Sequence, residues 1–337
     1  MAPWKEDSPG RYSRPIGENE TFIKLVSDPG HPLGREHWAI NSTVSIAPKG
    51  GLTSSRLVSQ LRLAWGHLRF THPSLAAYVS QDNKNLIYDV PKPEEVTAWV
   101  DETFNVAEEA SSAAEVISNL KPTPYAILIY IPKSNELLGH TAHWRTDGIG
   151  VMLLLAELLQ LAVKPNLTDP ASLSWGDEPK RLAPAVEDAA NIPLDANEDQ
   201  TQLANHYLST FALAGGAIGI PYVGDSSILP RGTYSASHTL DTSTTAAVIQ
   251  KCKSLNLSVT SALHASVAAA NFRLAAPSRK HEHYTSTVRF SLRPYLPAPY
   301  SGPDYAAGLY TTGWMDKVSA TSTWLENARH AEIPREH

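Results

Sequence analysis

The chain has 337 residues, of which 42% are hydrophobic and 18% are charged, so it can build one or two apolar cores and is not a disordered protein. Its 28 Lys and Arg residues against 34 Asp and Glu residues give a net charge of −6, which offers no attraction for nucleic acid or anionic lipid. The single cysteine, Cys252, excludes an internal disulfide and a Cys-rich metal site, and it favours a reducing compartment.

The beginning of the chain is polar and lacks the apolar segment of a signal peptide. Its first thirty residues are rich in Pro, Gly and charge, and we expect them to form an irregular arm. The longest apolar stretch, 148–163, is shorter than the roughly 20 residues that a membrane span needs. We therefore expect a cytoplasmic monomer with no membrane or nucleic-acid partner.

Apolar spacing predicts a helix and a hairpin in the first half. Apolar residues from Leu57 to Leu68 recur on one helical face, and this helix is expected to end at Pro73. Two β-rich runs, 125–131 and 136–143, flank a turn at 132–135 and indicate a hairpin. The second run leads into an apolar helix at 149–161, which is typical of a buried helix.

The rest of the chain contains segments with the apolar spacing of helices and segments with that of strands. The segment 163–200 contains prolines and acidic residues without a clear period, which indicates a linker. Further helices are expected at 203–213, 242–255 and 260–274, and strands at 235–240 and 284–292, the last with clean alternation. Cys252 falls on an apolar helix face. We predict a layered α/β fold with an N-terminal half (1–162), the linker (163–200) and a C-terminal half (201–337).

The residues most suited to chemistry are His-Trp-Arg-Thr-Asp-Gly at 143–148, between the second hairpin strand and the buried helix. His143 would be largely neutral at cellular pH and able to accept a proton, while Gly148 would permit a tight turn into the helix. A simpler interpretation leaves His143 bonded to a carbonyl group at a strand end and Asp147 as a helix cap.

Other chemistries find little support in the sequence. His140 and His143 would point to opposite faces of a strand, so we expect no metal site there, and His281 and His283 are expected to be solvated. No Gly-x-Ser-x-Gly elbow, Walker A loop or Gly-x-Gly-x-x-Gly sequence occurs.

The motif at 143–148 resembles the His-x-x-x-Asp-Gly motif of the chloramphenicol-acetyltransferase-like superfamily, which includes BAHD acyltransferases and the condensation domains of peptide synthetases. Two later stretches are similar to family segments as well: 258–266, which contains Thr-Ser-Ala-Leu-His-Ala, and 290–297, which contains Leu-Arg293-Pro, followed by 305–310. The similarity covers roughly residues 38–314. The chain most resembles fungal O-acetyltransferases of the trichothecene 15-O-acetyltransferase group.

This resemblance implies two halves with mixed sheets flanked by helices, and a reaction without a covalent acyl-enzyme. His143 would take a proton from the hydroxyl of a secondary metabolite, which attacks the thioester of acetyl-CoA or another acyl-CoA. Asp147 would pair with Arg293 beside His143, although Arg293 could instead be an exposed strand-end residue. Acyl-CoA is a co-substrate, no tightly bound cofactor is expected, and the residues that bind CoA are unassigned.

The chain departs from the family pattern in one respect. The late Asp-Phe-Gly-Trp-Gly motif of the family does not occur in it, so we expect an incomplete second half. Two alternatives to an active enzyme therefore stay open. One is an inactive or truncated acyltransferase-like binding protein, and the other is condensation-type transfer from an acyl carrier protein.

Overall fold

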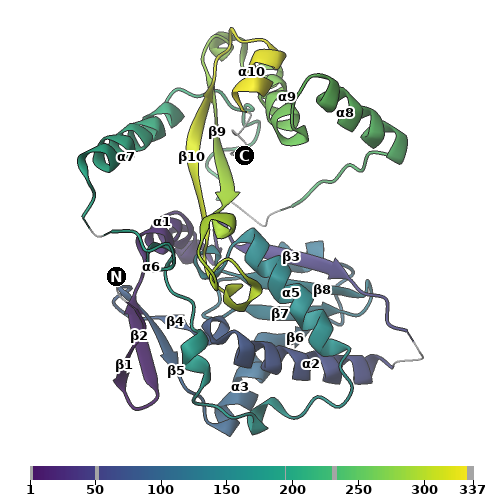
Figure 1. Ribbon diagram of the computed structural model, residues 1–337. Helices are drawn as coiled ribbons and strands as arrows, with labels where there is room; N and C mark the ends of the chain where they lie inside the picture. Colours follow the sequence, from purple (N-terminus) through teal and green to yellow (C-terminus); the bar gives the residue numbers. More distant parts are fainter. Residues whose placement is uncertain (1–2, 50–52, 194, 230–233, 332–337) are drawn as a thin grey trace. The chain divides into compact units, whose positions relative to one another are not determined.

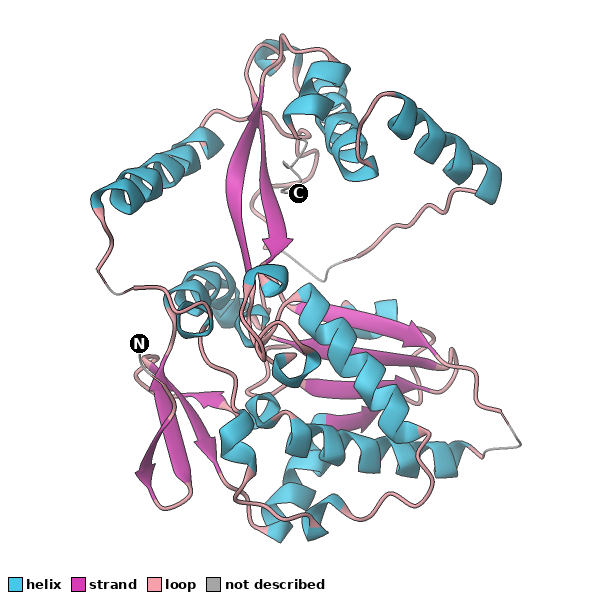
Figure 2. Ribbon diagram, viewed as in Figure 1, coloured by secondary structure: helices cyan, strands magenta, loops and turns pink. Residues whose placement is uncertain are grey.

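The computed structural model describes residues 3–49, 53–193, 195–229 and 234–331, which divide into two units (Figure 1). The first unit contains the described residues up to 193 together with Tyr234 and 291–312. The second contains 195–229, 235–290 and 313–331. The mixture of helices and strands confirms the predicted α/β class (Figure 2).

The first unit holds two sheets and the helices that cover them. The helices are α1 (Glu18–Ser27), α2 (Ser54–Thr71), α3 (Pro93–Thr103), α4 (Ala113–Ile117), α5 (Gly148–Ala162) and α6 (Val186–Ala189). The strands are β1 (Lys5–Ser8), β2 (Arg11–Pro15), β3 (Ile40–Ser45), β4 (Tyr78–Val79), β5 (Asn85–Asp89), β6 (Phe104–Val106), β7 (Ile127–Ile131) and β8 (Glu136–Thr141). The strand orders are β1-β2-β5-β4 and β3-β8-β7-β6.

The sheet β3-β8-β7-β6 carries the main core on one face. Along β7, Leu128 and Tyr130 belong to the cluster formed with α2 and α5. The alternate residues Ile127, Ile129 and Ile131 pack toward α4. The two long helices, α2 and α5, lie together over this sheet (Figure 1). Each fully buried aliphatic side chain in this layer contributes about 1.5–3 kcal/mol. The predicted helix at α2, the hairpin β7–β8 and the helix α5 are confirmed, but α5 is buried on one face only, because Ile149 and Met152 are 42% and 55% exposed.

The expected irregular arm is wrong, because the beginning of the chain is folded. Strands β1 and β2 form a hairpin, and β2 pairs along β5. Buried Arg14 and Glu20 form an ion pair at 2.6 Å, and Glu20 also accepts a hydrogen bond from the Gly17 amide at the start of α1. These contacts lie between segments whose local sequence carries no clear period, so periodicity could not reveal them.

The second unit contains, among its described residues, four helices and most of two paired strands, whose ends at Ser291 and 311–312 belong to the first unit. They are α7 (Glu198–Thr210), α8 (Thr242–Ser254), α9 (Val259–Leu274), α10 (Trp324–His330), β9 (Tyr284–Ser291) and β10 (Thr311–Val318). Cys252 is buried on α8, as predicted. The helix expected at 203–213 begins earlier, because the Asn197 side chain accepts the Gln200 amide and caps α7.

Two strand predictions need correction. Residues 235–240 form no strand and are exposed, since nothing pairs with this described segment to complete a ladder. The strand β9 is present, but its burial does not alternate between its two faces.

Within the described residues, no helix combines the length and the apolar character that crossing a membrane requires.

A buried histidine lies at the centre of the sheet. His140 on β8 is 3% exposed, pairs in register with Asn41 on β3, and places its Nδ1 2.8 Å from the Asn41 Oδ1. Burial lowers the pKa of His140 to about 4. The folded chain therefore keeps this ring neutral under mildly acidic conditions.

This histidine predicts a loss of stability at acidic pH. The unfolded ring titrates near pH 6.5, so between pH 6.5 and about pH 4 the unfolded chain binds a proton that the folded chain does not. The free energy of unfolding should therefore fall with decreasing pH across this window, by on the order of 3 kcal/mol from this residue. In His140→Gln, urea unfolding at several pH values should show a weaker dependence of the free energy of unfolding on pH. The difference from the wild type should correspond to one bound proton across this window.

The exposed and uncharged Gln81 provides the control, since Gln81→Ala removes no titrating group and should keep the wild-type dependence on pH. An unchanged slope in His140→Gln would contradict the assignment.

Candidate active site

His143 lies on a single 3-10 turn that connects the central sheet to α5. Strand β8 ends at Thr141, the turn comprises His143–Arg145, and α5 begins at Gly148. The residue is partly buried, and its Nδ1 is fully shielded from solvent. The strand and the helix on either side are both part of the core, so the imidazole is carried by a short and well-anchored connection.

The carboxylate of Asp147 ends this connection and binds three separate segments. Its Oδ1 accepts the Gly150 amide at 2.8 Å and caps α5, while its Oδ2 accepts the Tyr310 amide at 2.9 Å. The Arg293 Nη2 lies 3.1 Å from the same Oδ2. The structure therefore unites the two interpretations considered for Asp147, because this residue is both the helix cap and the partner of Arg293.

Arg293 is buried to the same degree as Asp147, with 4% and 2% of their surfaces exposed. Its guanidinium also donates to the carbonyl oxygens of Tyr305, Ala306 and Gly308, at 3.0–3.3 Å. The expectation of an exposed arginine at a strand end is excluded by this burial. A buried charge of either sign is costly without its partner, so the pair must form as a unit.

Arg145 is a structural residue of the motif that the sequence interpretation did not assign. It is 2% exposed, and it donates to the carbonyl oxygens of Ser74, Ala77 and Pro124 at 2.6–2.9 Å. Burial lowers the pKa of Arg145 to about 10, so it remains a cation at neutral pH. In the sequence, the only indication of this role was that Arg145 directly follows the apolar Trp144, next to a segment expected in the core.

The glycine that the site requires for close packing is Gly150. A Cβ atom at Gly150 would collide with the Ala306 carbonyl oxygen and the Thr146 Oγ1, and it would lie 2.8 Å from the Arg293 Nη2. At Gly148, by contrast, a Cβ atom would meet open space, and the backbone there has no positive φ. The structure therefore gives no steric reason for glycine at 148.

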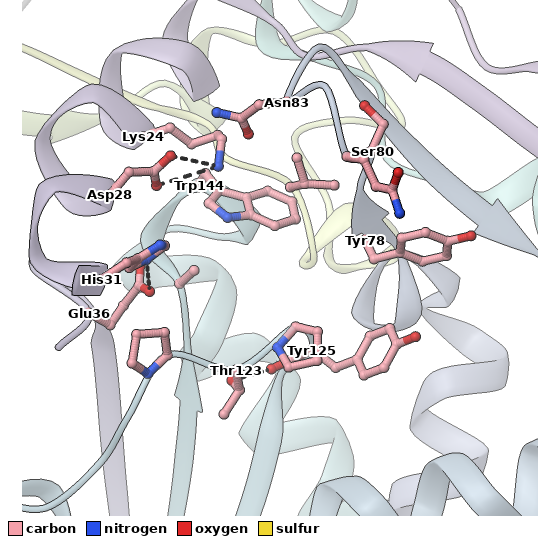
Figure 3. Close-up of a pocket in the computed structure, with 15 residues that line it drawn as sticks. Lys24, Asp28, His31, Glu36, Tyr78, Ser80, Asn83, Thr123, Tyr125 and Trp144 are labelled. Atoms are coloured by element: carbon pink, nitrogen blue, oxygen red, sulfur yellow. Dashed lines mark hydrogen bonds and ion pairs between the residues drawn. The ribbon is translucent and has the colours of Figure 1, made fainter. Parts of the chain in front are cut away.

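A cavity of about 550 Å³ reaches the motif from the side of α1 (Figure 3). It is lined by Ala142 and Trp144, the two neighbours of His143 in the sequence, and by Tyr78 and Tyr125. The Trp144 ring provides an aromatic wall beside the turn that carries the histidine. Its size falls in the range that drug-sized ligands occupy.

Charged groups line the opposite wall of this cavity. The Lys24–Asp28 ion pair measures 3.2 Å, and the His31 Nε2 lies 2.6 Å from the Glu36 Oε2; both contacts are marked in Figure 3. The Lys24 Nζ lies 5.8 Å from the centre of the Trp144 ring. Burial raises the pKa of Glu36, and its Oε1 is shielded from solvent without a hydrogen-bond partner in the described residues. A ligand with a hydrogen-bond donor would satisfy that oxygen.

The second stretch with family resemblance places His264 on α9 of the second unit. Its Nε2 lies 2.6 Å from the Ser286 Oγ and 3.9 Å from the Asp316 Oδ2. A Ser-His-Asp triad requires the serine and the aspartate on different ring nitrogens, so this cluster does not have that geometry. No group of three or more His, Cys, Asp or Glu residues in the described segments could hold a metal ion.

Breaking the Asp147–Arg293 pair should destabilise the first unit strongly. In Arg293→Ala the carboxylate stays buried without its cation, which predicts a loss of about 3–5 kcal/mol in the free energy of unfolding. Denaturant unfolding of the variant and the wild type measures this loss. Lys133→Ala, which removes an exposed ion pair with Glu109, is the control and should change stability little. Wild-type stability in Arg293→Ala would contradict a stabilising role of the Asp147–Arg293 pair.

The two glycines of α5 provide a matched pair of substitutions. Gly150→Ala should lower the free energy of unfolding by about 1–3 kcal/mol, because its methyl group overpacks the contact with Ala306 and Thr146. Gly148→Ala should be neutral or slightly stabilising, since the site is open and alanine favours the helix. Thermal melting of the two variants side by side tests this, and equal melting temperatures would refute it.

The chain was compared with known proteins at the level of sequence and structure. No protein-family model matches it. It is 42% identical to "Acetyltransferase pigO" of Monascus ruber over 328 residues, which are 97% of this chain and 71% of that protein. It is 30% identical to "O-acetyltransferase pigM" of the same organism, over 96% of this chain and 63% of pigM, so it spans less than two thirds of the length of pigM.

Solved structures agree on the fold. The trichothecene 15-O-acetyltransferase TRI3 of Fusarium sporotrichioides superposes with a TM-score of 0.76 and 20% identity, over 98% of this chain and 73% of that one. The first condensation domain of the calcium-dependent antibiotic synthetase matches with a TM-score of 0.57 and 13% identity, over 94% of this chain and 72% of that one. The protein thus has the chloramphenicol-acetyltransferase-like fold, and it belongs to the family of fungal acetyltransferases that includes pigO.

Proposed function

We propose that this acyltransferase moves an acetyl group from acetyl-CoA to a hydroxyl group of a secondary metabolite, with His143 as general base. The observation that carries the proposal is the placement of His143 on a fixed turn whose two flanking residues line a cavity. The names of pigO and TRI3 support acetyl as the transferred group.

The proposed chemistry needs one proton acceptor and two substrates held together. The imidazole takes the proton of the acceptor hydroxyl while the oxygen attacks the thioester carbonyl carbon. When the tetrahedral intermediate collapses, the C–S bond breaks and the CoA thiolate takes the proton from the imidazolium. Because Nδ1 is shielded from solvent, we assign this exchange to Nε2.

The buried arginines position this base, and they do not touch the reacting atoms in the proposal. Asp147 and Arg293 fix the start of α5, and Arg145 fixes the turn on its other side. Direct transfer depends on a near-attack arrangement of two substrates, so small displacements of the base would be costly in rate. The rigidity of this connection therefore fits a reaction without a covalent intermediate.

The cavity of Figure 3 is the proposed place for the body of the acceptor. Trp144 offers an aromatic face to a flat or cyclic molecule, and the polar side chains of Lys24 and Glu36 in the opposite wall favour an acceptor with a second hydroxyl group. We infer a polyhydroxylated, largely apolar acceptor. The reaction requires acetyl-CoA only as a co-substrate, and one copy of the chain suffices.

Replacement of the proposed base should abolish transfer. With acetyl-CoA and a panel of polycyclic alcohols, His143→Ala should release free CoA thiol about 10²–10⁴-fold more slowly than the wild type, because general base catalysis is lost. A thiol reagent measures the release, and mass spectrometry confirms the ester product. Thermal melting of the variant verifies that it is folded.

The matched control is His281→Ala, an exposed histidine outside the motif, which should keep wild-type activity. Thiol release at the same rate in His143→Ala would overturn the assignment of the base. Release that occurs only from an acyl carrier protein, and not from acetyl-CoA, would favour condensation-type transfer. No transfer from either donor, with no binding of CoA, would favour the non-catalytic alternative.

A further inference from the structure

A second cavity of the first unit contains a buried arginine that forms no ion pair within the described residues. Arg69, in the last turn of α2, is 5% exposed, yet it lines an open cavity of about 580 Å³. Its Nε and Nη1 are shielded from solvent and have no hydrogen-bond partner among the described residues. Buried arginines normally pair with a carboxylate or donate to carbonyl groups, as Arg145 and Arg293 do.

The contacts that Arg69 does make leave its hydrogen-bonding capacity unused. Its Cζ lies 4.8 Å from the centre of the Trp99 ring and 5.4 Å from that of Trp175. Aromatic rings attract the charge, but they accept none of the in-plane N–H groups in the way an oxygen would. The guanidinium is therefore held between two aromatic rings, while its Nε and Nη1 lack the acceptor that an oxygen anion would supply.

The carboxylates around the same cavity do not neutralise this arginine. Asp89 is bound by Arg11 at 2.6 Å and accepts the Tyr78 hydroxyl at 2.8 Å. Glu95 accepts the backbone amide of Lys92 at 2.7 Å, and Glu102 is exposed. Among the charged side chains that line the cavity in the described residues, Arg69 is the buried one.

The walls indicate what kind of anion would fit. Trp99, Tyr78 and Tyr125 line the cavity, and the Trp99 and Tyr125 rings meet edge to face at 6.4 Å. Such walls favour a flat, apolar body, while the fork of the guanidinium matches two carboxylate oxygens. Tyr78 and Tyr125 also line the cavity of Figure 3, but no other residue is shared, so the two cavities are separate spaces.

We propose that this cavity binds an aromatic carboxylate, with Arg69 as its anion-binding residue, at a site separate from that of acyl transfer. The carboxylate completes the hydrogen bonds of the guanidinium, and the ring of the ligand packs against Trp99 and the tyrosines. The site is independent of the proposed role of His143, because neither His143 nor its sequence neighbours line this cavity.

Isothermal titration of the full chain with 1-naphthoate tests the proposal. We expect saturable binding of one equivalent, at least about tenfold tighter than that of the neutral 1-naphthalenemethanol, because a charge-assisted pair is lost with the alcohol. Inorganic phosphate should bind more weakly than naphthoate, since it lacks the ring. Equal affinity for the naphthoate and the alcohol, or tighter binding of phosphate, would overturn the proposal.

Variants locate the site. Arg69→Met keeps the bulk of the side chain and should abolish the preference for the anion. Because this change also removes contacts with two tryptophans, Ala98→Glu provides a test that removes no buried group. Ala98 is exposed on α3 and lines the cavity, so a carboxylate there should weaken naphthoate binding by about tenfold or more.

The control for this variant is Thr97→Glu, on the same helix but outside the cavity lining. Both positions are exposed and have an acidic residue four positions later, so the two variants differ mainly in whether the new charge faces the cavity. Naphthoate should bind to Thr97→Glu as to the wild type. Equal binding to Ala98→Glu and Thr97→Glu would place the ligand elsewhere and refute the proposed site.

Discussion

One buried carboxylate determines the geometry of the candidate active site. Asp147 accepts hydrogen bonds from the amides of Gly150 and Tyr310 and from the guanidinium of Arg293, which are separated from it by 3, 163 and 146 positions in the sequence. A desolvated carboxylate is tolerated only when its donors are all in place. This requirement fixes the start of α5 against the 305–310 segment, and it thereby fixes the turn that carries His143.

The same turn is held on its other side by a second buried cation. Arg145 donates to the backbone carbonyl groups of Ser74, Ala77 and Pro124, and no carboxylate is needed because these three oxygens accept its hydrogen bonds. Between these two anchors, the buried strand β8 and the apolar helix α5 supply the core. The result is a short connection with little freedom, which is what a general base in a direct transfer reaction requires.

The first unit combines two cavities that differ in the polar group left without a hydrogen-bond partner among the described residues. The cavity beside the motif contains Glu36, with one carboxylate oxygen unsatisfied, whereas the neighbouring cavity contains Arg69, with donors unsatisfied. Unsatisfied buried polar groups are uncommon in folded proteins, and a ligand that completes their hydrogen bonds is one explanation. An acceptor atom and a set of donors would select different ligands: a hydroxylated acceptor on one side and an organic anion on the other.

The sequence by itself determined the features that depend on local pattern. The apolar spacing from Leu57 to Leu68 predicted α2, the runs around 132–135 predicted the β7–β8 hairpin, and the family resemblance singled out His143, Asp147 and Arg293. It did not predict the folded N-terminal hairpin, and it wrongly expected a strand at 235–240. The tertiary structure alone decided the anchoring of Arg145, the close packing at Gly150 and the unpaired state of Arg69. Periodicity reports which face of an element is buried, whereas these features depend on which atoms from distant segments meet there, and a linear pattern contains no information on that.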